Sequence, residues 1–456
     1  MITASTPKGT RDFLPVDVYK RDYIFNTIRT IFQKYGYQPI ETPAMENLIT
    51  LTGKYGDEGD KLLFKILNSG DFLGNVPSEK LSKITSKELA PDISEKGLRY
   101  DLTVPFARFV VQHRNDLIFP FKRYQIQPVW RADRPQKGRY REFYQCDVDV
   151  IGSNSLLNDL ELIQIIDEVF TKFNIDITIK INHRKILLGL CELYGITDKF
   201  NDFVVALDKL DKIGIDGVEQ ELKNRDINID FQELRNDLTG ILAHDLSEIQ
   251  NLKLKFEKIG SVNGLKGIND ITTLFSNFDH IDINRQKIIF DISLARGLNY
   301  YTGCIFEVVA KNSDIGSICG GGRYDDLTGI FGLNDISGTG VSFGADRIFD
   351  LLSQTGNFPD DLKSTVKILF VNFGEAEARF CLKILDKLRK SGISAELYPD
   401  TTKLKKQLDY ANNRKIPFVI MIGSREIEQN LFPVKNMITG EQVSMDLDQI
   451  RNHFKS

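Results

Sequence analysis

The pattern of apolar and polar residues changes its period along the chain, and each change predicts a different element. Over 17–36 the apolar residues recur at helical spacing, which predicts a helix that Gly36 ends. The next segment, 37–47, contains Pro39 and Pro43. Proline lacks a backbone donor, so this segment suits a sheet edge or an interface rather than a central strand.

A second pattern predicts a β-hairpin. Apolar and polar residues alternate over 141–150, which is typical of a strand, and 123–130 is the predicted partner across a polar turn at 135–138. Arginines on paired strands can hold phosphates in bidentate fashion, and an aromatic ring such as Phe143 can stack on a base. A solvated basic hairpin is the ordinary alternative. The cations around the turn are Arg131, Arg134, Lys137, Arg139 and Arg141.

The character of the chain changes after residue 195. Helical patterns rich in Asp, Lys, Asn and Ile predict a helical insertion over 195–285, strand-like and glycine-rich signals return over 288–350, and the polar segment 353–365 predicts a linker. The tail then alternates between predicted strands and helices, which indicates an α/β unit with a mostly parallel sheet. Its predicted strands are 366–373, 393–399 and 417–423, and its predicted helices are 375–391 and 402–414. The first turn, NFGEAEA, has one glycine where a dinucleotide fingerprint needs three, which argues against that site.

Composition narrows the class of protein. A chain of 456 residues with 41% hydrophobic and 27% charged residues is typical of a globular protein, and its net charge of −4 means that nucleic acid would have to meet a local basic surface. The polar N-terminus and the lack of an apolar run of about 18 residues argue against a signal peptide and a membrane span. Five dispersed cysteines without a CxxC pair, and no HExxH motif, predict a cytoplasmic protein without a metal site. There is no P-loop sequence.

Three later segments carry further candidate chemistry. They are 291–308 with Arg296, Tyr300 and Tyr301, 317–329 with GGGRYDD, and 338–352 with Arg347. Each has an ordinary explanation alone: half-buried tyrosines, a flexible glycine turn, or an ion pair of Arg347 with Asp346 or Asp350. Together they bring arginines, acids and tyrosines near predicted strand ends, where glycine lets a ligand approach the backbone.

These segments resemble the motifs of a known enzyme family. The hairpin around Arg131 resembles motif 2 of the class II aminoacyl-tRNA synthetases, GTGVSFGADR resembles motif 3, and GYQPIETP resembles motif 1, the dimerisation element. LARGLNYYTG and CGGGRYDDL are similar to the two signatures of the histidyl-tRNA synthetase family, and KGTRDFLP also fits that family. The resemblance spans almost the whole chain, with the motifs in the expected order.

The resemblance implies a class II synthetase fold, namely an α+β catalytic domain with an antiparallel sheet, a helical insertion and a C-terminal α/β anticodon-binding domain. It implies activation of L-histidine with ATP and Mg²⁺, transfer of histidine to histidine tRNA, and a homodimer marked by Pro43. The expected boundaries are 1–199 and 284–352 for the catalytic domain, 200–283 for the insertion, 353–365 for the linker and 366–456 for the anticodon-binding domain.

The resemblance also implies roles for individual residues. Arg131 and Arg296 would be catalytic, on either side of the α-phosphate. ATP would contact Arg131, Asp133, Arg139, Phe143 and Arg347. Histidine would contact Asp101, Thr103, Arg131, Gln145, Asp149, Arg296, Tyr300, Tyr301 and Tyr324. The tRNA would contact Gln136 and Lys137 in the motif 2 turn and Lys403, Lys405 and Lys406 in the tail.

Two points remain open from the sequence. Asp101 and Asp149 stand where many bacterial members carry Glu, and DLTVPFAR and FYQCDVD look like a eukaryotic-type variant. The alternatives to an enzyme are a regulatory subunit of the ATP phosphoribosyltransferase type, which keeps the fold without charging tRNA, and a catalytically silent RNA-binding protein. The anticodon segment and the Arg296 signature favour the enzyme.

Overall fold

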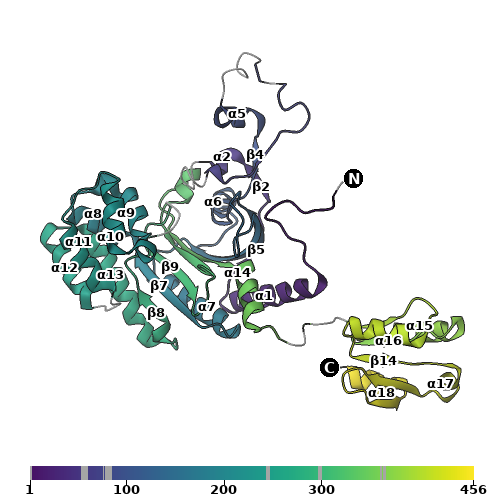
Figure 1. Ribbon diagram of the computed structural model, residues 1–456. Helices are drawn as coiled ribbons and strands as arrows, with labels where there is room; N and C mark the ends of the chain where they lie inside the picture. Colours follow the sequence, from purple (N-terminus) through teal and green to yellow (C-terminus); the bar gives the residue numbers. More distant parts are fainter. Residues whose placement is uncertain are drawn as a thin grey trace. The chain divides into compact units, whose positions relative to one another are not determined.

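The computed structural model describes residues 3–52, 60–74, 76–77, 85–242, 247–295, 300–359, 362 and 366–455. The chain divides into two compact units, residues 1–12 with 21–357 and residues 13–20 with 358–456, and each contains a sheet (Figure 1). Within the described ranges, none of the helices combines the length and the apolar character that crossing a bilayer requires.

The larger unit is built on an eight-stranded sheet in the order β1-β5-β6-β11-β10-β9-β7-β8. The strands from β5 to β7 in this order are antiparallel, whereas the edge strands β1 and β8 run parallel to their neighbours. The position of Pro39 at the edge confirms its prediction, and so does the pairing of β5 with β6. The bounds are β1 (Gln38–Pro39), β5 (Phe121–Trp130), β6 (Glu142–Ile151), β7 (Ile177–His183), β8 (Ile288–Phe290), β9 (Cys304–Ala310), β10 (Cys319–Tyr324) and β11 (Gly338–Gly344).

Side chains alternate along the central strands, so that one face of the sheet packs against helices and the other face does not carry these contacts. Successive side chains of a strand point to opposite sides, so residues two apart share a face. Phe343 of β11 packs its ring 5.8 Å from Phe32 of α1 (Pro15–Lys34) and 5.7 Å from Phe170 of α7 (Leu156–Lys172). Its neighbour Ser342 therefore points to the opposite face of the sheet, as does Asp147, which pairs with Ser342 across β11 and β6.

Several smaller elements surround this sheet. Helices α8 to α13 form a cluster beside β7, β8 and β9 (Figure 1). Helices α9 to α13 lie within the part of the chain predicted to be helical, whereas α8 precedes it. Helix α14 continues to Thr355, three residues into the predicted linker 353–365, because it ends at Gly356 in the left-handed conformation, which favours glycine. The remaining bounds are β2 (Met45–Asn47), α2 (Leu48–Leu51), β3 (Lys65–Ile66), α5 (Ser86–Ile93), β4 (Lys96–Leu98), α6 (Thr103–Gln112), α8 (Arg184–Leu193), α9 (Phe200–Leu207), α10 (Leu210–Lys223), α11 (Phe231–Leu242), α12 (Ser247–Ile259), α13 (Val262–Asn277) and α14 (Ala345–Thr355).

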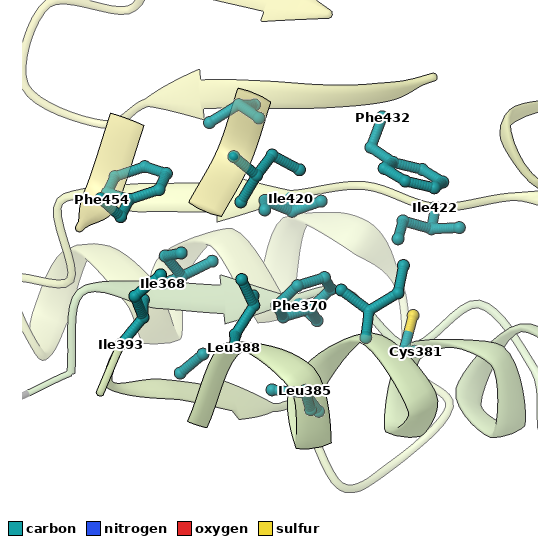
Figure 2. Close-up of a cluster of buried hydrophobic side chains, with 14 residues drawn as sticks. Ile368, Phe370, Cys381, Leu385, Leu388, Ile393, Ile420, Ile422, Phe432 and Phe454 are labelled. Carbon is teal, nitrogen blue, oxygen red and sulfur yellow. The ribbon is translucent and has the colours of Figure 1, made fainter. Parts of the chain in front are cut away.

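The smaller unit has a five-stranded sheet in the order β13-β12-β14-β15-β16. Its first three strands are parallel, but β15 and β16 add two antiparallel pairs, so the prediction of a mostly parallel sheet was wrong for half of the pairings. Figure 2 shows the core, one cluster of buried side chains that includes Leu385 and Leu388 of α15 together with Ile368, Phe370 and Phe454. The bounds are β12 (Ile368–Phe370), α15 (Glu375–Lys390), β13 (Ala395–Leu397), α16 (Leu404–Asn413), β14 (Phe418–Ile420), α17 (Ser424–Gln429), β15 (Phe432–Asn436), β16 (Gln442–Met445) and α18 (Leu447–Phe454).

Candidate active site

The β5–β6 hairpin supplies one wall of a cleft with a volume of about 480 Å³. Its two strands pair along their full length, and the turn between them closes where Gln136 and Arg139 exchange backbone hydrogen bonds of 3.1 and 2.9 Å. The cleft brings together predicted residues that lie far apart in the sequence. These residues are Asp101, Thr103, Arg131, Asp133, Arg139, Phe143, Gln145, Tyr300, Tyr301 and Arg347.

Arg131 is held between two aromatic rings. Its guanidinium carbon lies 4.2 Å from the centre of the Tyr100 ring and 5.2 Å from that of Phe143, and its Nε donates to the Tyr100 carbonyl at 3.0 Å. Cation–π contacts of this kind fix the plane of a guanidinium without neutralising its charge. Arg131 is therefore oriented at the cleft with a full positive charge available to an anion.

Two further arginines lie near the turn. Arg139 Nη1 is 3.7 Å from Asp133 Oδ1, and its side chain is 48% exposed, so this ion pair is weak enough to be exchanged for a phosphate. Arg347 donates from Nε to the Gly138 carbonyl at 2.9 Å and from Nη1 to the Ser317 carbonyl. Arg347 thus joins α14 to the motif 2 turn, a set of partners that the sequence did not predict.

A smaller cavity of about 20 Å³ adjoins the cleft and shares Thr103, Tyr301, Gly320 and Ser342 with it. Two predicted residues, Asp149 and Tyr324, line this cavity rather than the larger cleft. Tyr324 donates its hydroxyl to Asp149 Oδ1 at 2.8 Å. Gly340 lies opposite Asp149 in the sheet, and a Cβ there would come within 1.9 Å of Asp149 Oδ1, so only glycine leaves room for this carboxylate.

The smaller cavity is acidic and has one buried cation beneath it. Arg123 is fully buried on β5, with Nη2 at 2.8 Å from Asp149 Oδ2 and 4.0 Å from Asp147 Oδ2. Its guanidinium also lies 4.2 Å from the centre of the Phe106 ring. One arginine thus serves two carboxylates, which compete for a single positive charge.

Burial dominates the titration of these groups. It raises the pKa of Asp147 to about 7, although the charge of Arg123 acts in the opposite direction and Asp149 adds to the rise. Burial likewise raises the pKa of Asp149, against the effect of Arg123 and the Tyr324 hydrogen bond. Burial also raises the pKa of the Tyr301 and Tyr324 hydroxyls, so both stay neutral donors at neutral pH.

Two buried oxygens in this region, Gln145 Oε1 and Asp147 Oδ1, accept no hydrogen bond from any residue that the structure describes. Asp149 Oδ2, in contrast, faces Arg123 Nη2 at 2.8 Å. A buried acceptor without a partner costs about 1–3 kcal/mol, so this cavity favours a ligand that brings N–H donors. An ammonium group and an imidazole N–H both meet this requirement.

Sequence reasoning missed Asp147, Arg123, Ser342 and Gly340 as parts of this site. The signal that could have found Asp147 is the period of two on β6: Gln145, Asp147 and Asp149 must share a face. Arg123 could not be found locally, because its position opposite Asp149 depends on the hairpin register.

Comparison with known proteins agrees with this geometry. A family model described as histidyl-tRNA synthetase matches residues 92–348, and one described as anticodon binding domain matches 365–456. The histidine–tRNA ligase of Phocaeicola vulgatus is 55% identical over 445 residues, covering 97% of both chains. That of Christiangramia forsetii is 53% identical over 453 residues, covering 99% of both. The chain belongs to the histidyl-tRNA synthetase family.

A solved structure supports the same conclusion for the fold. The histidyl-tRNA synthetase from Nostoc sp. PCC 7120 matches with a TM-score of 0.83 at 30% identity, covering 100% of this chain and 99% of that one. The class II fold predicted from the motifs is therefore confirmed. The curated relatives are bacterial histidyl-tRNA synthetases, so the interpretation of Asp101 and Asp149 as marks of a eukaryotic-type variant is not supported. Aspartate at these positions alone does not identify the source of a family member.

The structure does not describe every predicted residue. Arg296, the second predicted catalytic residue of the histidyl-tRNA synthetase signature, falls outside the described residues, so its role stays a prediction. Gln136 and Lys137 are exposed at the tip of the motif 2 turn and do not line the cleft. In the smaller unit, Lys403, Lys405 and Lys406 are exposed at the start of α16.

Proposed function

We propose that this chain activates L-histidine with ATP to give histidyl-adenylate and pyrophosphate, and then transfers histidine to the 3′ end of histidine tRNA. The observation that carries the proposal is the junction of the two cavities. Buried acceptors on Gln145 and Asp147 that lack a partner among the described residues adjoin a cleft lined by Arg131 and Arg139. Membership of the histidyl-tRNA synthetase family supports the same reaction.

Recognition of histidine would use the acceptor-rich end of the site. Asp101, Thr103 and Gln145 would take the α-amino and carboxylate groups, and Asp149, Tyr301 and Tyr324 would surround the imidazole, with Tyr300 behind them. Tyr300 and Tyr324 support this packing because their rings lie 6.2 Å apart in an edge-to-face arrangement. A site with buried polar groups that histidine pairs would reject analogues without those groups by about 10⁴–10⁵.

Adenylation would take place at the arginine-lined end. An oxygen of the histidine carboxylate would attack the α-phosphorus, and the bond from that phosphorus to the bridging oxygen would break as pyrophosphate leaves. Arg131 and Arg296 would stabilise the charge on the α-phosphate from two sides. Arg139 would hold the outer phosphates. Phe143 and Arg347 would enclose the adenine, near Asp133.

Magnesium would arrive with ATP rather than occupy a protein site. Asp133 already pairs with Arg139, and Asp346 pairs with Arg11 and Arg21. Among the residues described, no group of three or more His, Cys, Asp or Glu side chains could hold a metal ion. When bound, Mg²⁺ supplies charge neutralisation of the phosphates and helps pyrophosphate leave.

The tRNA would contact both units. Gln136 and Lys137 would meet the acceptor end from the motif 2 turn, and the segment 200–283 would act as an acceptor clamp. The domain from 366 to 456 would bind the anticodon stem through phosphate contacts of Lys403, Lys405 and Lys406. We also propose a homodimer in which the segment around Pro43 lies at the interface.

Histidine-dependent exchange of labelled pyrophosphate into ATP tests this function. The proposal expects exchange that requires histidine and no other amino acid. A regulatory subunit of the ATP phosphoribosyltransferase type, or a silent RNA-binding protein, would give none. Folded protein that binds histidine without exchange would therefore exclude the ligase.

A further inference from the structure

The N-terminal segment 7–11 lies directly against the motif 2 turn. The backbone N–H and the hydroxyl of Thr10 both donate to the Pro7 carbonyl, at 3.1 and 2.7 Å, which closes a tight turn. The Arg141 backbone N–H donates to the Gly9 carbonyl at 2.8 Å. Gly9 has φ +89°, and a Cβ there would come within 2.8 Å of Arg141 and 2.9 Å of Pro135, so this close approach requires glycine.

Arg11 extends the same contact to α14. Its Nη2 pairs with Asp346 Oδ1 and its Nη1 lies 3.5 Å from Asp350 Oδ1. Its guanidinium carbon is also 3.4 Å from the centre of the Tyr140 ring, and the Tyr140 hydroxyl donates to Asp350 Oδ2 at 2.8 Å. Arg11 therefore joins an aromatic residue of the turn to two carboxylates of the helix.

These contacts leave Arg139 between two fixed neighbours. Gly138 before it accepts a hydrogen bond from Arg347, and Tyr140 after it is stacked on Arg11. The Arg139 side chain itself is half-exposed, and its partner among the residues that the structure describes is Asp133, through a long ion pair. The position of this guanidinium in the cleft thus depends on how its backbone is held.

We propose that residues 7–11 are a positioning element for the motif 2 turn, and that Arg11 is the positioning residue that sets Arg139 for the outer phosphates of ATP. The inference rests on the proposed function, because it assumes that ATP occupies the cleft. Histidine recognition is expected to be independent of it, since Asp149 and Tyr324 lie on β6 and β10 and, within the described chain, form their hydrogen bond and ion pair with each other and with Arg123 rather than with residues 7–11.

If the role of Arg11 were purely structural, its removal would destabilise the fold. Asp346 keeps a second cation when Arg11 is removed, because Arg21 Nη1 donates to Asp346 Oδ1 at 2.6 Å and the Tyr144 backbone N–H donates to Asp346 Oδ2 at 2.8 Å. The Arg11 side chain is 24% exposed, so its loss opens no closed cavity. We therefore expect Arg11→Ala to fold with little change in Tm.

The test measures steady-state pyrophosphate exchange for the full chain and its variants. Arg11→Ala should raise the KM for ATP at least about tenfold and leave the KM for histidine within about twofold. Arg11→Lys keeps the charge but loses the planar stacking group, so it should give an intermediate KM for ATP. Arg379→Ala, which removes an exposed arginine of α15, is the matched control and should match the wild type.

A double-mutant cycle separates positioning from general damage. If Arg11 acts through Arg139, adding Arg11→Ala to Arg139→Ala should raise the KM for ATP by much less than it does in the wild type. Additive effects, an unchanged KM for ATP, or equal rises in both KM values would overturn the inference. Absence of exchange in the wild type would instead reject the proposed function, so the two failures are distinguishable.

Discussion

Arg131 has a structural setting that fits a charge-stabilising role rather than a structural one. It lies at the cleft between Tyr100 and Phe143 and makes one neutral backbone hydrogen bond through Nε. A positioned arginine in phosphoryl chemistry is worth about 10³–10⁵ in rate. We therefore expect Arg131→Ala to lower the single-turnover adenylation rate by about 10³ or more, with little change in Tm.

The control for Arg131 comes from the same turn. Arg134 is exposed and does not line the cleft, so Arg134→Ala should keep the adenylation rate within about twofold. Similar losses of adenylation rate in both variants would show that the total positive charge of the hairpin, and not the position of Arg131, determines the rate. Rapid-quench measurement of adenylate formation distinguishes these outcomes without any tRNA.

The ionisation of Asp147 should make the thermal stability of the protein depend on pH. Burial raises its pKa to about 7 in the folded chain, whereas an unfolded aspartate titrates near about 4, so the folded state holds a proton that the unfolded state lacks between these values. Stability from this group is thus present at low pH and is lost as pH rises towards about 7. Asp147→Asn cannot ionise, so its Tm relative to the wild type should increase from pH 5 to pH 8, as thermal unfolding would show.

Asp291 provides a control of opposite sign. Although burial acts to raise it, hydrogen bonds from Lys180 and Ser293 hold the pKa of Asp291 below its ordinary value. Its contribution is lost only as pH falls through that lowered pKa, so Asp291→Asn should reduce Tm by the same amount at pH 5 and pH 8. A flat difference for Asp147→Asn as well would contradict a protonated Asp147.

Gly340 leaves space for a carboxylate that is proposed to bind histidine. Gly340 of β11 lies opposite Asp149, and an added Cβ would also meet the Val148 carbonyl at 2.9 Å. Gly340→Ala should displace Asp149 from Tyr324 and Arg123 and raise the KM for histidine by about tenfold or more, with a smaller effect on the KM for ATP. Pyrophosphate exchange at varied substrate concentrations measures both values.

A second glycine near the cleft serves as the comparison for Gly340. At Gly316 an added Cβ would meet its nearest neighbour, Arg347 Nη1, only at 4.0 Å. Gly316→Ala should therefore change neither KM by more than about twofold. A Gly340→Ala variant with normal histidine kinetics would mean that Asp149 does not bind the substrate.

Local pattern predicted some elements well and others poorly. The strands over 123–130 and 141–150 were found to within two residues, because one-sided burial imposes alternation. The strands β15 and β16 were missed, and β16 is mostly exposed, so its sequence carries little apolar signal. The antiparallel half of the smaller sheet was therefore not predicted.

The site depended on contacts that no local pattern contains. Asp101, Arg131 and Tyr301 line one cleft although they come from distant parts of the chain, and only the family resemblance grouped them in advance. Asp147 received no role from the sequence, because a buried acid and a solvated one look alike in a single strand. Its burial follows from the layers of the whole sheet.

In the proposed function, the larger unit would perform adenylation and the smaller unit would bind the anticodon. Lys403, Lys405 and Lys406 are exposed at the start of α16. Replacing all three with alanine should weaken aminoacylation at limiting tRNA and leave pyrophosphate exchange unchanged. Each lost phosphate contact should also reduce the salt dependence of tRNA binding by about 0.7–0.9 in the log–log slope.

A matched control exists in the same unit, because Lys383, Lys387 and Lys390 are three exposed lysines of α15. Their replacement changes the net charge of the unit equally but removes no predicted tRNA contact. If both triple variants weaken aminoacylation to the same extent, the effect is one of overall charge. A loss of aminoacylation confined to the α16 variant would place the tRNA contact at these three lysines. The reason is that electrostatic attraction at physiological salt is screened within about 8 Å.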